Sequence, residues 1–572
     1  MTLLEGTLGT ILATRAELTP DQLAFTHSTD GAPPYARINY AELHSWVQGV
    51  AARIRGSVDA GAHVLLLIEP GLEFVAGLFA CFQAGVVAIS TAPPNPRRIH
   101  RTMPRLLRVC ADAQVDAVLT TRAMYESSYA ELSGQAELTG RPWVVVDDTA
   151  TGGTGPLEND PTAVAFIQYT SGSTSAPRGV MLSQENLLAN ARVIEKGLRI
   201  SPESRVFSWL PPSHDMGLFC GVVLPVRLGI PAAIMSPTGF LKRPHRWLEG
   251  ISGFRATISG GPNFAYDLAC FRTSPEQREG LDLSTWDVAF NGAERIRAQT
   301  VRDFTATFAP CGFRPESIYP CYGLAEATLM VSGPHARRAP TFVELQRSDL
   351  EAGVVKVGTD VSVNHTFVAC GEVGEGHEVV IVDPATCRRC PPDRIGEIWI
   401  SGPSVAPGYW RRLADTEERF GGRLADDDRR YLRTGDLGFL CDGEVVITGR
   451  LSDIIIVRGR NLYPQDIELA AEEAHPLIRR HCSAAFACTA ASGQTAVAMV
   501  LEVEPTDDDE LTQIIAAAHE RVLKELDVQV HSIALVGPGN VPKTTSGKTQ
   551  RKLCAKRFQS GELALFAIWD RT

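Results

Sequence analysis

Positive charge is scarce in this chain relative to negative charge. Lys and Arg number 55 and Asp and Glu number 66, which gives a formal net charge of -11 with histidine neutral. Proteins that bind DNA or RNA need a basic surface to neutralise phosphates. The charge balance therefore predicts that nucleic acids are not partners of this protein.

Long apolar runs are also missing. The most apolar window, residues 217–235, is interrupted by Pro225, Arg227 and Pro231, whereas a membrane-spanning helix needs about 20 consecutive apolar residues. The N-terminal segment MTLLEGTLGTILATRAEL has Glu5 early and no basic region before its apolar positions, unlike a secretory signal. We therefore expect no integral membrane segment and a cytoplasmic location.

Regular cysteine spacing is absent as well. The 13 cysteines are scattered through 572 residues, which favours reduced thiols over a disulfide framework. Cys387 and Cys390 form the pair CRRC, but no second pair or histidine motif stands at ligand spacing. We interpret this pair as chance rather than as a zinc or redox site.

Short apolar runs alternate with helical patterns in the N-terminal half. HVLLLI at 63–68 and WVVVD at 143–147, with the apolar segment 72–87 between them, predict βαβ units and mainly parallel sheets. From about 354 to 447, short β-rich pieces separated by Gly, Pro and Asp predict a small antiparallel β-unit. The segments after 453 predict a compact α+β part, so we place a domain boundary near Arg450 to Ser452.

The stretch YTSGSTSAPRG at 169–179 has the composition of a loop rather than of a core element. A strand-like segment precedes it, and Ser183 can cap the helix QENLLANARVIEKGL that follows. Backbone N–H groups and hydroxyls of such a loop can converge on phosphate oxygens, with Arg178 adding charge. The stretch lacks the Gly-Lys-Ser/Thr of a Walker A loop. By itself it indicates either a nucleotide site or a flexible surface loop.

Seven further stretches follow in a fixed order. They are WLPPSHDMGL (209–218), NGAE (291–294), YGLAEATLM (322–330), GEIWISGPSVAPGYW (396–410), YLRTGDLG (431–438), GRLSDIIIVRGRNLYPQDIE (449–468) and PKTTSGKTQRK (542–552). Together they resemble the adenylate-forming superfamily of acyl-CoA synthetases, luciferases and nonribosomal adenylation domains, from about residue 20 to residue 557.

This resemblance implies a fold and a domain organisation. The fold is α/β, with a large N-terminal domain, residues 1–451, of two βαβ-type subdomains plus a small β-barrel-like subdomain. A small mobile α+β C-terminal domain, residues 452–572, follows, with Ser452 at the hinge. The cofactors implied are ATP and Mg²⁺.

The resemblance also assigns site residues. The β- and γ-phosphates of ATP would be held by Thr170, Ser171, Gly172, Ser173, Thr174 and Arg178. Glu326 would hold Mg²⁺ with the Thr174 hydroxyl near it, since Mg²⁺ bound to phosphates takes a few hard oxygen ligands from the protein. The adenine pocket would be formed by Gly292, Ala293, Glu294, Tyr322 and Gly323, and the ribose would be bound by Asp436 and Arg450.

Two residues are assigned to the reacting groups. Lys548 lies in PKTTSGK, whose composition suits an exposed loop tip, and would stabilise the transition state at the carboxylate and α-phosphate. His214 would gate or orient the carboxylate at the acyl entrance. The neighbouring Lys543, Arg551, Lys552, Lys556 and Arg557 are predicted to form a solvated basic face, on which an acidic partner could also dock.

Several motifs are closer to fatty acyl-AMP ligases than to CoA ligases, among them SGGPNFAYDLAC, FNGAERI and RGRNLYPQDIE. This resemblance also implies an insertion near 335–367 that packs against the large domain through Phe342, Val343, Leu345 and Leu350. By restricting domain rotation it would disfavour CoA and leave the acyl-adenylate for a separate holo acyl carrier protein in lipid, polyketide or nonribosomal-peptide biosynthesis.

Three alternatives remain open. One is a medium- or long-chain acyl-CoA ligase, and another is adenylation of an amino-substituted fatty acid, with Asp215 facing a substrate ammonium. The third is a catalytically silent nucleotide- or acyl-binding protein, which the presence of Lys548, Glu326 and Asp436 disfavours.

Overall fold

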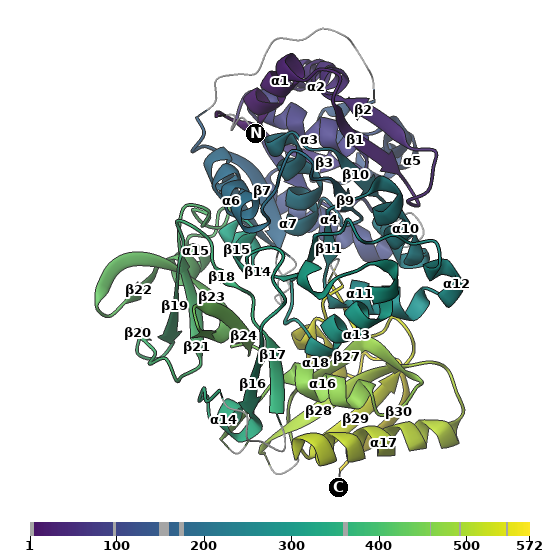
Figure 1. Ribbon diagram of the computed structural model, residues 1–572, viewed down its shortest axis with the longest axis vertical. Coiled ribbons are helices and arrows are strands. Elements are labelled where there is room, and N and C mark those ends of the chain that lie inside the picture. The colour runs from purple at the N-terminus through teal and green to yellow at the C-terminus, as the bar shows by residue number, and fades with distance from the viewer. Residues whose placement is uncertain are drawn as a thin grey trace.

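The structure, a computed structural model, consists of a large body and a small body (Figure 1). It describes residues 5–94, 99–147, 160–170, 177–357, 364–457, 459–490, 493–544 and 547–571. The large body combines two α/β sheets with an antiparallel sheet, and the C-terminal elements form the small body beneath it in the view of Figure 1. This arrangement confirms the predicted fold class, while the boundary between residues 451 and 452 stays a prediction.

Six strands form the first α/β sheet, in the order β6-β5-β3-β4-β7-β8. All pairings are parallel except that of β7 with β8. The strands are β3 (His63–Leu67), β4 (Val87–Ser90), β5 (Ala117–Thr120), β6 (Trp143–Val145), β7 (Val164–Thr170) and β8 (Arg178–Ser183). Helix α3 (Leu72–Ala84) contacts strands of both α/β sheets, which is why it is apolar on almost every side.

Seven strands form the second α/β sheet, in the order β13-β12-β11-β9-β10-β1-β2. Its pairings are parallel except that of β1 with β2. The strands are β1 (Leu23–Ser28), β2 (Ala36–Asn39), β9 (Val206–Ser208), β10 (Ala232–Met235), β11 (Ile258–Gly261), β12 (Val288–Asn291) and β13 (Ile318–Pro320). The two sheets confirm the two predicted βαβ-type subdomains.

Helices connect and cover these two sheets (Figure 1). Their bounds are α1 (Leu8–Leu18), α2 (Tyr40–Arg55), α4 (Ile99–Ala113), α5 (Arg122–Leu132), α6 (Gln184–Gly197), α7 (Asp215–Leu218), α8 (Leu224–Leu228), α9 (Pro237–Lys242), α10 (His245–Phe254), α11 (Asn263–Arg272), α12 (Pro275–Arg278) and α13 (Ala298–Phe308). The apolar window at 217–235 folds as α7, a π-helical turn, α8 and β10, all packed in the core. In the ranges that the structure describes, no helix has the length and apolar character needed to cross a membrane.

The connection around the hydroxyl-rich stretch differs from the prediction of a loop between a strand and a helix. Strand β8 intervenes, pairing antiparallel with β7 and burying Val180 and Leu182. Helix α6 begins only after Ser183, whose hydroxyl accepts the Asn186 N–H at 3.1 Å, as predicted for its cap. The stretch therefore joins two strands rather than a strand and a helix.

An antiparallel sheet of nine strands follows in the chain. It begins at Tyr322, earlier than the predicted start near residue 354, because the motif after β13 already pairs as a hairpin. The strands are β14 (Tyr322–Gly323), β15 (Met330–Gly333), β18 (Glu372–Val373), β19 (Glu378–Asp383), β20 (Arg388–Arg389), β21 (Gly396–Ser401), β22 (Gly422–Leu424), β23 (Asp427–Cys441) and β24 (Glu444–Arg450), with α15 (Leu413–Phe420) beside them. The segment between β15 and β18 forms a separate hairpin of β16 (Phe342–Gln346) and β17 (Asn364–Val368), with α14 (Arg347–Glu351).

The small body has its own core. Its sheet has the order β27-β28-β29-β30, with one apolar cluster under α16 and α17 and another under α18. Its elements are β25 (Ile455–Val457), β26 (Arg460–Leu462), α16 (Pro464–Glu472), β27 (Ile478–Thr489), β28 (Thr495–Val503), α17 (Asp508–Leu526), β29 (Val530–Val536), α18 (Arg551–Gln559) and β30 (Leu565–Asp570).

Candidate functional site

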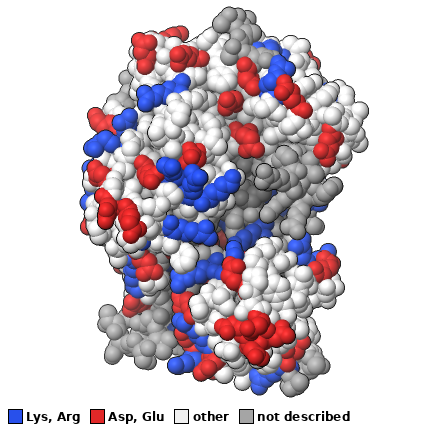
Figure 2. Space-filling view, turned by 90° about the vertical axis from the view of Figure 1, so that its right-hand side faces the viewer, with Lys and Arg blue, Asp and Glu red and all other residues white. Residues whose placement is uncertain are grey.

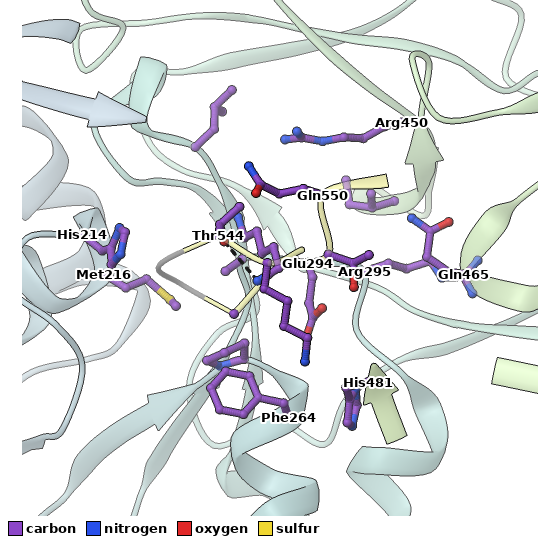
Figure 3. A pocket seen from close by; sticks show the side chains of 18 of the residues that line it. His214, Met216, Phe264, Glu294, Arg295, Arg450, Gln465, His481, Thr544 and Gln550 are labelled. Carbon is purple, nitrogen blue, oxygen red and sulfur yellow. Dashed lines mark hydrogen bonds between the residues drawn. The ribbon is translucent and has the colours of Figure 1, made fainter. Parts of the chain in front are cut away.

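A cavity of about 2010 Å³ lies where the two bodies meet. Segments that directly follow the carboxyl ends of parallel strands line it, among them His214 after β9, Phe264 after β11 and Glu294 after β12. This is the edge at which open α/β sheets bind ligands. Figure 3 shows His214 and Met216 on one side of the pocket and Arg295 and Gln465 on the other.

Asp436 is held by two of the other predicted site residues. Its carboxylate is buried; Oδ1 accepts from Arg450 Nε at 2.8 Å and Oδ2 accepts from the Tyr322 hydroxyl at 2.8 Å. Asp436 and Arg450 stand opposite each other on β23 and β24. Burial, and then the Asp436 charge, raise the pKa of Tyr322 well above its ordinary value, and Asp436 raises the pKa of Arg450. The structure thus holds Tyr322 as a neutral donor and Arg450 as a cation.

The segment NGAE shows a strained backbone. Ala293 lines the cavity with a φ of 74°, a left-handed conformation that non-glycine residues rarely adopt. Glu294 also lines it, and its Oε1 accepts from Asn263 Nδ2 at 3.0 Å. Gly292 instead packs against Cys321, whose carbonyl oxygen lies 2.9 Å from where a Cβ would stand.

The β14-β15 hairpin requires a glycine at position 323. A Cβ on Gly323 would lie 1.7 Å from the Leu329 carbonyl oxygen, so the β14-β15 hairpin cannot form with a larger residue there. This hairpin sets the position of Glu326, which lies in the turn between the two strands.

Glu326 and Arg178 are linked through Tyr409. The Tyr409 hydroxyl donates to Glu326 Oε1 at 2.6 Å, and the Arg178 guanidinium lies 5.4 Å from the centre of the same ring. Arg178 also pairs with Asp415 at 3.4 Å. Thr170, at the end of β7, lines the cavity beside them, whereas Ser171, Gly172, Ser173 and Thr174 lie outside the described residues. Tyr409 was missed from the sequence, although it is the next-to-last residue of the motif GEIWISGPSVAPGYW.

Lys548 stands on a hairpin that enters the cavity from the small body. The Lys548 carbonyl accepts the Thr544 N–H at 2.8 Å, and the Lys548 N–H donates to Thr544 Oγ1 at 3.1 Å. Gly547, with a φ of 84°, sits against Phe264 of α11. The tip of this hairpin therefore touches the large body.

The electrostatics of Lys548 identify its neighbours. Desolvation by the surrounding protein, and then the Arg450 charge, lower the pKa of Lys548, while Asp215, Glu294 and Asp436 oppose that shift. Burial raises the pKa of Asp215, and the Lys548 charge opposes the rise. The predicted catalytic lysine, the ribose pair and the adenine segment thus share one electrostatic environment.

The hinge region is tied to the small body by an ion-pair network. Ser452 is exposed and its hydroxyl donates to Asp453 Oδ1 at 2.8 Å. Asp453 Oδ2 lies 3.2 Å from Arg551, which also binds Glu468 through two hydrogen bonds of 2.7 and 2.6 Å. Arg551 was expected on a solvated basic face. That prediction is wrong, because these two carboxylates hold its guanidinium inside the body.

Residues 342–357 and 364–368 pack between the two bodies. Val343, Leu345 and Leu350 are buried in one cluster with Phe439 and Val446 of the antiparallel sheet and with Tyr463 of the small body. Phe342 differs, remaining 37% exposed with the Arg302 guanidinium over its ring.

Two polar contacts join this segment to the small body. Glu351 accepts from Arg460 Nε at 2.7 Å and from Arg460 Nη2 at 2.9 Å. His365 Nδ1 lies 3.7 Å from Asp466 Oδ2, and Asp466 also pairs with Arg295 of the large body.

Comparisons with known proteins agree with this geometry. Residues 12–410 match the family model described as AMP-binding enzyme, and residues 452–567 match one described as Disco-interacting protein 2-like, AMP domain. The chain is 42% identical over 570 residues to the medium-chain-fatty-acid–[acyl-carrier-protein] ligase JamA of Moorena producens, covering 98% of this chain and 96% of that protein. A long-chain-fatty-acid–AMP ligase of Mycobacterium bovis is 34% identical, with 98% of each chain covered.

Solved structures give the same result. The fatty acid AMP ligase from Legionella pneumophila superimposes with a TM-score of 0.75 at 35% identity, covering 99% of this chain and 98% of that one. A structure from a study of the fatty acyl-adenylate ligases of E. coli and L. pneumophila gives a TM-score of 0.87 at 32% identity, with 98% of each chain covered. The chain belongs to the AMP-binding enzymes and, among them, to the fatty acyl-AMP ligases of the adenylate-forming superfamily.

Proposed function

We propose that this enzyme activates a fatty acid with ATP to an acyl-adenylate, releases pyrophosphate, and transfers the acyl group to the phosphopantetheine thiol of a separate acyl carrier protein. The convergence of Lys548 with Asp436, Arg450 and Glu294 in one cavity carries this proposal. In the chemical step a carboxylate oxygen attacks the α-phosphorus, and the bond to the oxygen bridging the α- and β-phosphorus breaks.

Charge neutralisation is the main task of the protein groups in this step, because two anions must meet. Lys548 supplies a cation at the place where the carboxylate and the α-phosphate come together. Arg178 is positioned by Asp415 and Tyr409 to meet the β- and γ-phosphates. Thr170 and the segment 171–174 would add hydroxyl and backbone donors.

Glu326 fits an Mg²⁺ bound to the phosphates. Its carboxylate is a hard oxygen ligand of the kind that Mg²⁺ takes, and Tyr409 engages one of its two oxygens and fixes its orientation. The Thr174 hydroxyl would stand near the ion. The ion would neutralise charge on the phosphate oxygens.

The nucleoside would lie between Tyr322 and the segment 292–294. Asp436, oriented by Tyr322 and Arg450, has acceptor capacity left for the ribose hydroxyls, because a carboxylate offers about four lone-pair sites. Glu294 is oriented by Asn263 toward the same region.

The deep part of the cavity suits an alkyl chain. Buried apolar side chains line it from α6, the π-helical turn, β13 and β15; they are Ile194, Leu198, Cys220, Tyr319 and Met330. His214 is the N-cap of α7 and lines the same cavity, where it would orient the carboxylate.

Asp215 bears on the alternative of an amino-substituted acid. Its carboxylate interacts electrostatically with Lys548 and accepts the Met216 N–H at 2.8 Å. A catalytic lysine is therefore already its cationic neighbour, which supports a plain fatty acid over a substrate with an ammonium group.

The contacts of segment 342–368 support a carrier protein over CoA as acceptor. Glu351 and His365 join this segment to Arg460 and Asp466 of the small body, so they oppose its rotation away from the adenylate-forming arrangement. The pathway and the cytoplasmic location stay predictions from the sequence.

The test is a product analysis with the purified full-length protein. Saturated acids of increasing chain length are incubated with ATP and Mg²⁺, and pyrophosphate and acyl-AMP are quantified by a coupled assay and mass spectrometry. CoA and a holo acyl carrier protein are then added in parallel. We expect acyl-AMP to accumulate with CoA and to be consumed by the carrier protein, whereas abundant acyl-CoA would favour the CoA ligase.

A further inference from the structure

The rim of the cavity carries two large apolar side chains in water. Phe271, near the C-terminal end of α11, is 84% exposed, and Leu241 of α9 is 52% exposed; both line the cavity. The opposite face of α11 is buried through Ala265, Tyr266 and Ala269, so the helix is already anchored without Phe271. The two helices are adjacent, because the ring centres of Phe240 on α9 and Phe264 on α11 lie 6.5 Å apart. Exposed apolar side chains on a pocket rim are typical of an interaction surface.

Cations surround these apolar side chains on the same rim. Arg272, Arg480 and Lys552 are exposed and line the cavity, and none has a carboxylate partner among the residues that the structure describes. Of the exposed carboxylates that also line it, Glu473 and Glu504 are paired with Arg521 and Arg479. The other two, Glu294 and Glu418, stand on the large body, after β12 and on α15. Figure 2 shows Lys and Arg gathered around the hollow between the two bodies. Uncompensated positive charge therefore collects at one rim of a chain whose net charge is -11.

We propose that Leu241, Phe271, Arg272, Arg480 and Lys552, the rim surface, form the docking site of the acidic carrier protein that accepts the acyl group. This inference rests on the proposed function. The overall negative charge repels an acidic protein elsewhere, and the rim cations attract it to the opening of the cavity that holds Lys548. Phe271 and Leu241 would then be covered by its apolar surface residues.

CoA also carries phosphates, so the rim cations could attract CoA as well as an acidic protein. The exposure of Phe271 favours a protein over CoA as the ligand of this rim. A docked protein covers surface beyond its phosphopantetheine arm, including apolar side chains. The experiment therefore compares three thiols: the holo acyl carrier protein of bacterial fatty acid synthesis, CoA, and pantetheine, which has the arm without protein or nucleotide.

The variants are Arg272→Glu and Phe271→Ala in the full-length enzyme. Lys524→Glu is the matched control for the first, because Lys524 is also an exposed cation in the last turn of a helix. Leu413→Ala is the control for the second, because Leu413 is 87% exposed on α15. Dodecanoyl-AMP is formed in situ, and its transfer to each thiol is followed by mass spectrometry.

We expect Arg272→Glu to raise the KM for the holo carrier about tenfold, because the carrier and the enzyme associate more slowly. The KM should also depend less on salt concentration than in wild type. Phe271→Ala is expected to raise the same KM. Acyl-AMP formation and transfer to pantetheine stay at the control level. Wild-type transfer to the carrier no faster than to pantetheine, or variants equal to their controls, would overturn the docking site.

Two further outcomes separate the docking site from the proposed function. If Arg272→Glu impairs transfer to CoA as much as transfer to the carrier, the rim serves nucleotide phosphates, and the docking inference fails. If wild-type protein forms no acyl-AMP, the proposed function fails, and the docking inference fails with it.

Discussion

Charged residues of both signs surround Lys548, and their balance affects its pKa. Desolvation and Arg450 lower its pKa, while Asp215, Glu294 and Asp436 act in the opposite direction. A lysine in this position is a cation that loses its proton at lower pH than a lysine in water. Gly547, the residue before Lys548, rests against Phe264 of the large body, which keeps this part of the chain at the cavity.

Replacing Lys548 with alanine is expected to lower the rate of acyl-AMP formation by about 10²- to 10³-fold, the usual effect of removing one transition-state donor. ATP binding and thermal stability should change little, because Lys548 lies outside the helices, strands and apolar clusters of the described residues. Lys556→Ala, which removes an exposed cation from α18, is the control. Single-turnover acyl-AMP measurements and calorimetric ATP titration check this. Lys548→Ala with a rate near that of Lys556→Ala would exclude the catalytic role.

The charge state of Lys548 predicts a pH dependence. Because its pKa is lowered, acyl-AMP formation should fall as pH rises through a value below that of an ordinary lysine. Asp215→Asn removes a charge that raises the pKa of Lys548, so this alkaline limb should move to lower pH. Asp303→Asn, an exposed change on α13, should leave the limb in place. A limb that does not move in Asp215→Asn would contradict the proximity of the two groups.

At the scale of elements, the hairpin β16-β17 with α14 joins parts that sequence patterns place in different domains. Its apolar side chains complete a cluster with the antiparallel sheet and with Tyr463. Its charged residues face outward to the small body, where Glu351 forms a two-point contact with Arg460. Planar two-point pairing of Arg with a carboxylate adds geometric specificity as well as energy.

Loss of the Glu351 carboxylate should therefore favour rotation of the small body. Hydrogen bonds to charged groups contribute about 1.5 to 3 kcal/mol, so Glu351→Ala should raise acyl-CoA formation roughly tenfold. Acyl-AMP formation should be unchanged.

The control for this prediction is Asp527→Ala. Asp527 also contacts Arg460, but from within the small body, so its removal leaves the contact between the bodies intact. Chromatographic separation of acyl-AMP and acyl-CoA checks both variants. Equal acyl-CoA formation by Glu351→Ala and Asp527→Ala would show that the contact does not control the acceptor.

At the scale of the whole molecule, several ion pairs hold the two bodies together around the cavity. Asp466 pairs with Arg295, His481 Nε2 lies 2.6 Å from Asp267 Oδ2, and Arg297 lies 3.8 Å from Glu472. Burial acts to raise the pKa of Asp466, but the charges of Arg295 and His365 outweigh it and hold that pKa below its ordinary value. Asp466 therefore stabilises the closed arrangement above its ordinary pKa, and this contribution is lost as pH falls through the lowered value.

Arg295→Met should weaken the closed arrangement by about 3 kcal/mol, the lower end of the cost of leaving a buried charge without its partner. The Asp466 pKa should rise in this variant, so opening on acidification should begin at higher pH than in wild type. Adding Asp466→Asn should recover part of the loss. Arg192→Met, an exposed change on α6, is the control. X-ray scattering and thermal unfolding at several pH values check the prediction; a profile equal to that of the control would contradict it.

Much of the fold and of the candidate site could be predicted before the structure, because the relevant signals are local. Alternating apolar runs predicted βαβ units and mainly parallel sheets, the family resemblance predicted two such subdomains, and Ser183 was identified as a cap from its place before a helical pattern. The short motifs that resemble the adenylate-forming superfamily contain Tyr322, Glu326, Asp436, Arg450 and Lys548, and all five residues line one cavity. The strand β8 was missed, since six residues after a hydroxyl-rich stretch carry too little pattern to separate a strand from a loop.

The sequence by itself determined the family and the groups available for chemistry. It also determined that α/β segments come first in the chain, followed by an antiparallel part and an α+β part. Each of these depends on residues close together in the chain. Only the tertiary structure decided which of these groups meet. Tyr322 and Asp436 are 114 residues apart, and Arg460 reaches Glu351 across 109 residues. Arg551 was expected on a solvated basic face and is held by two carboxylates. The exposure of Phe271 at the cavity rim became visible only in the folded chain. Burial and charge pairing depend on distances between distant segments, and these distances exist only once the chain has folded.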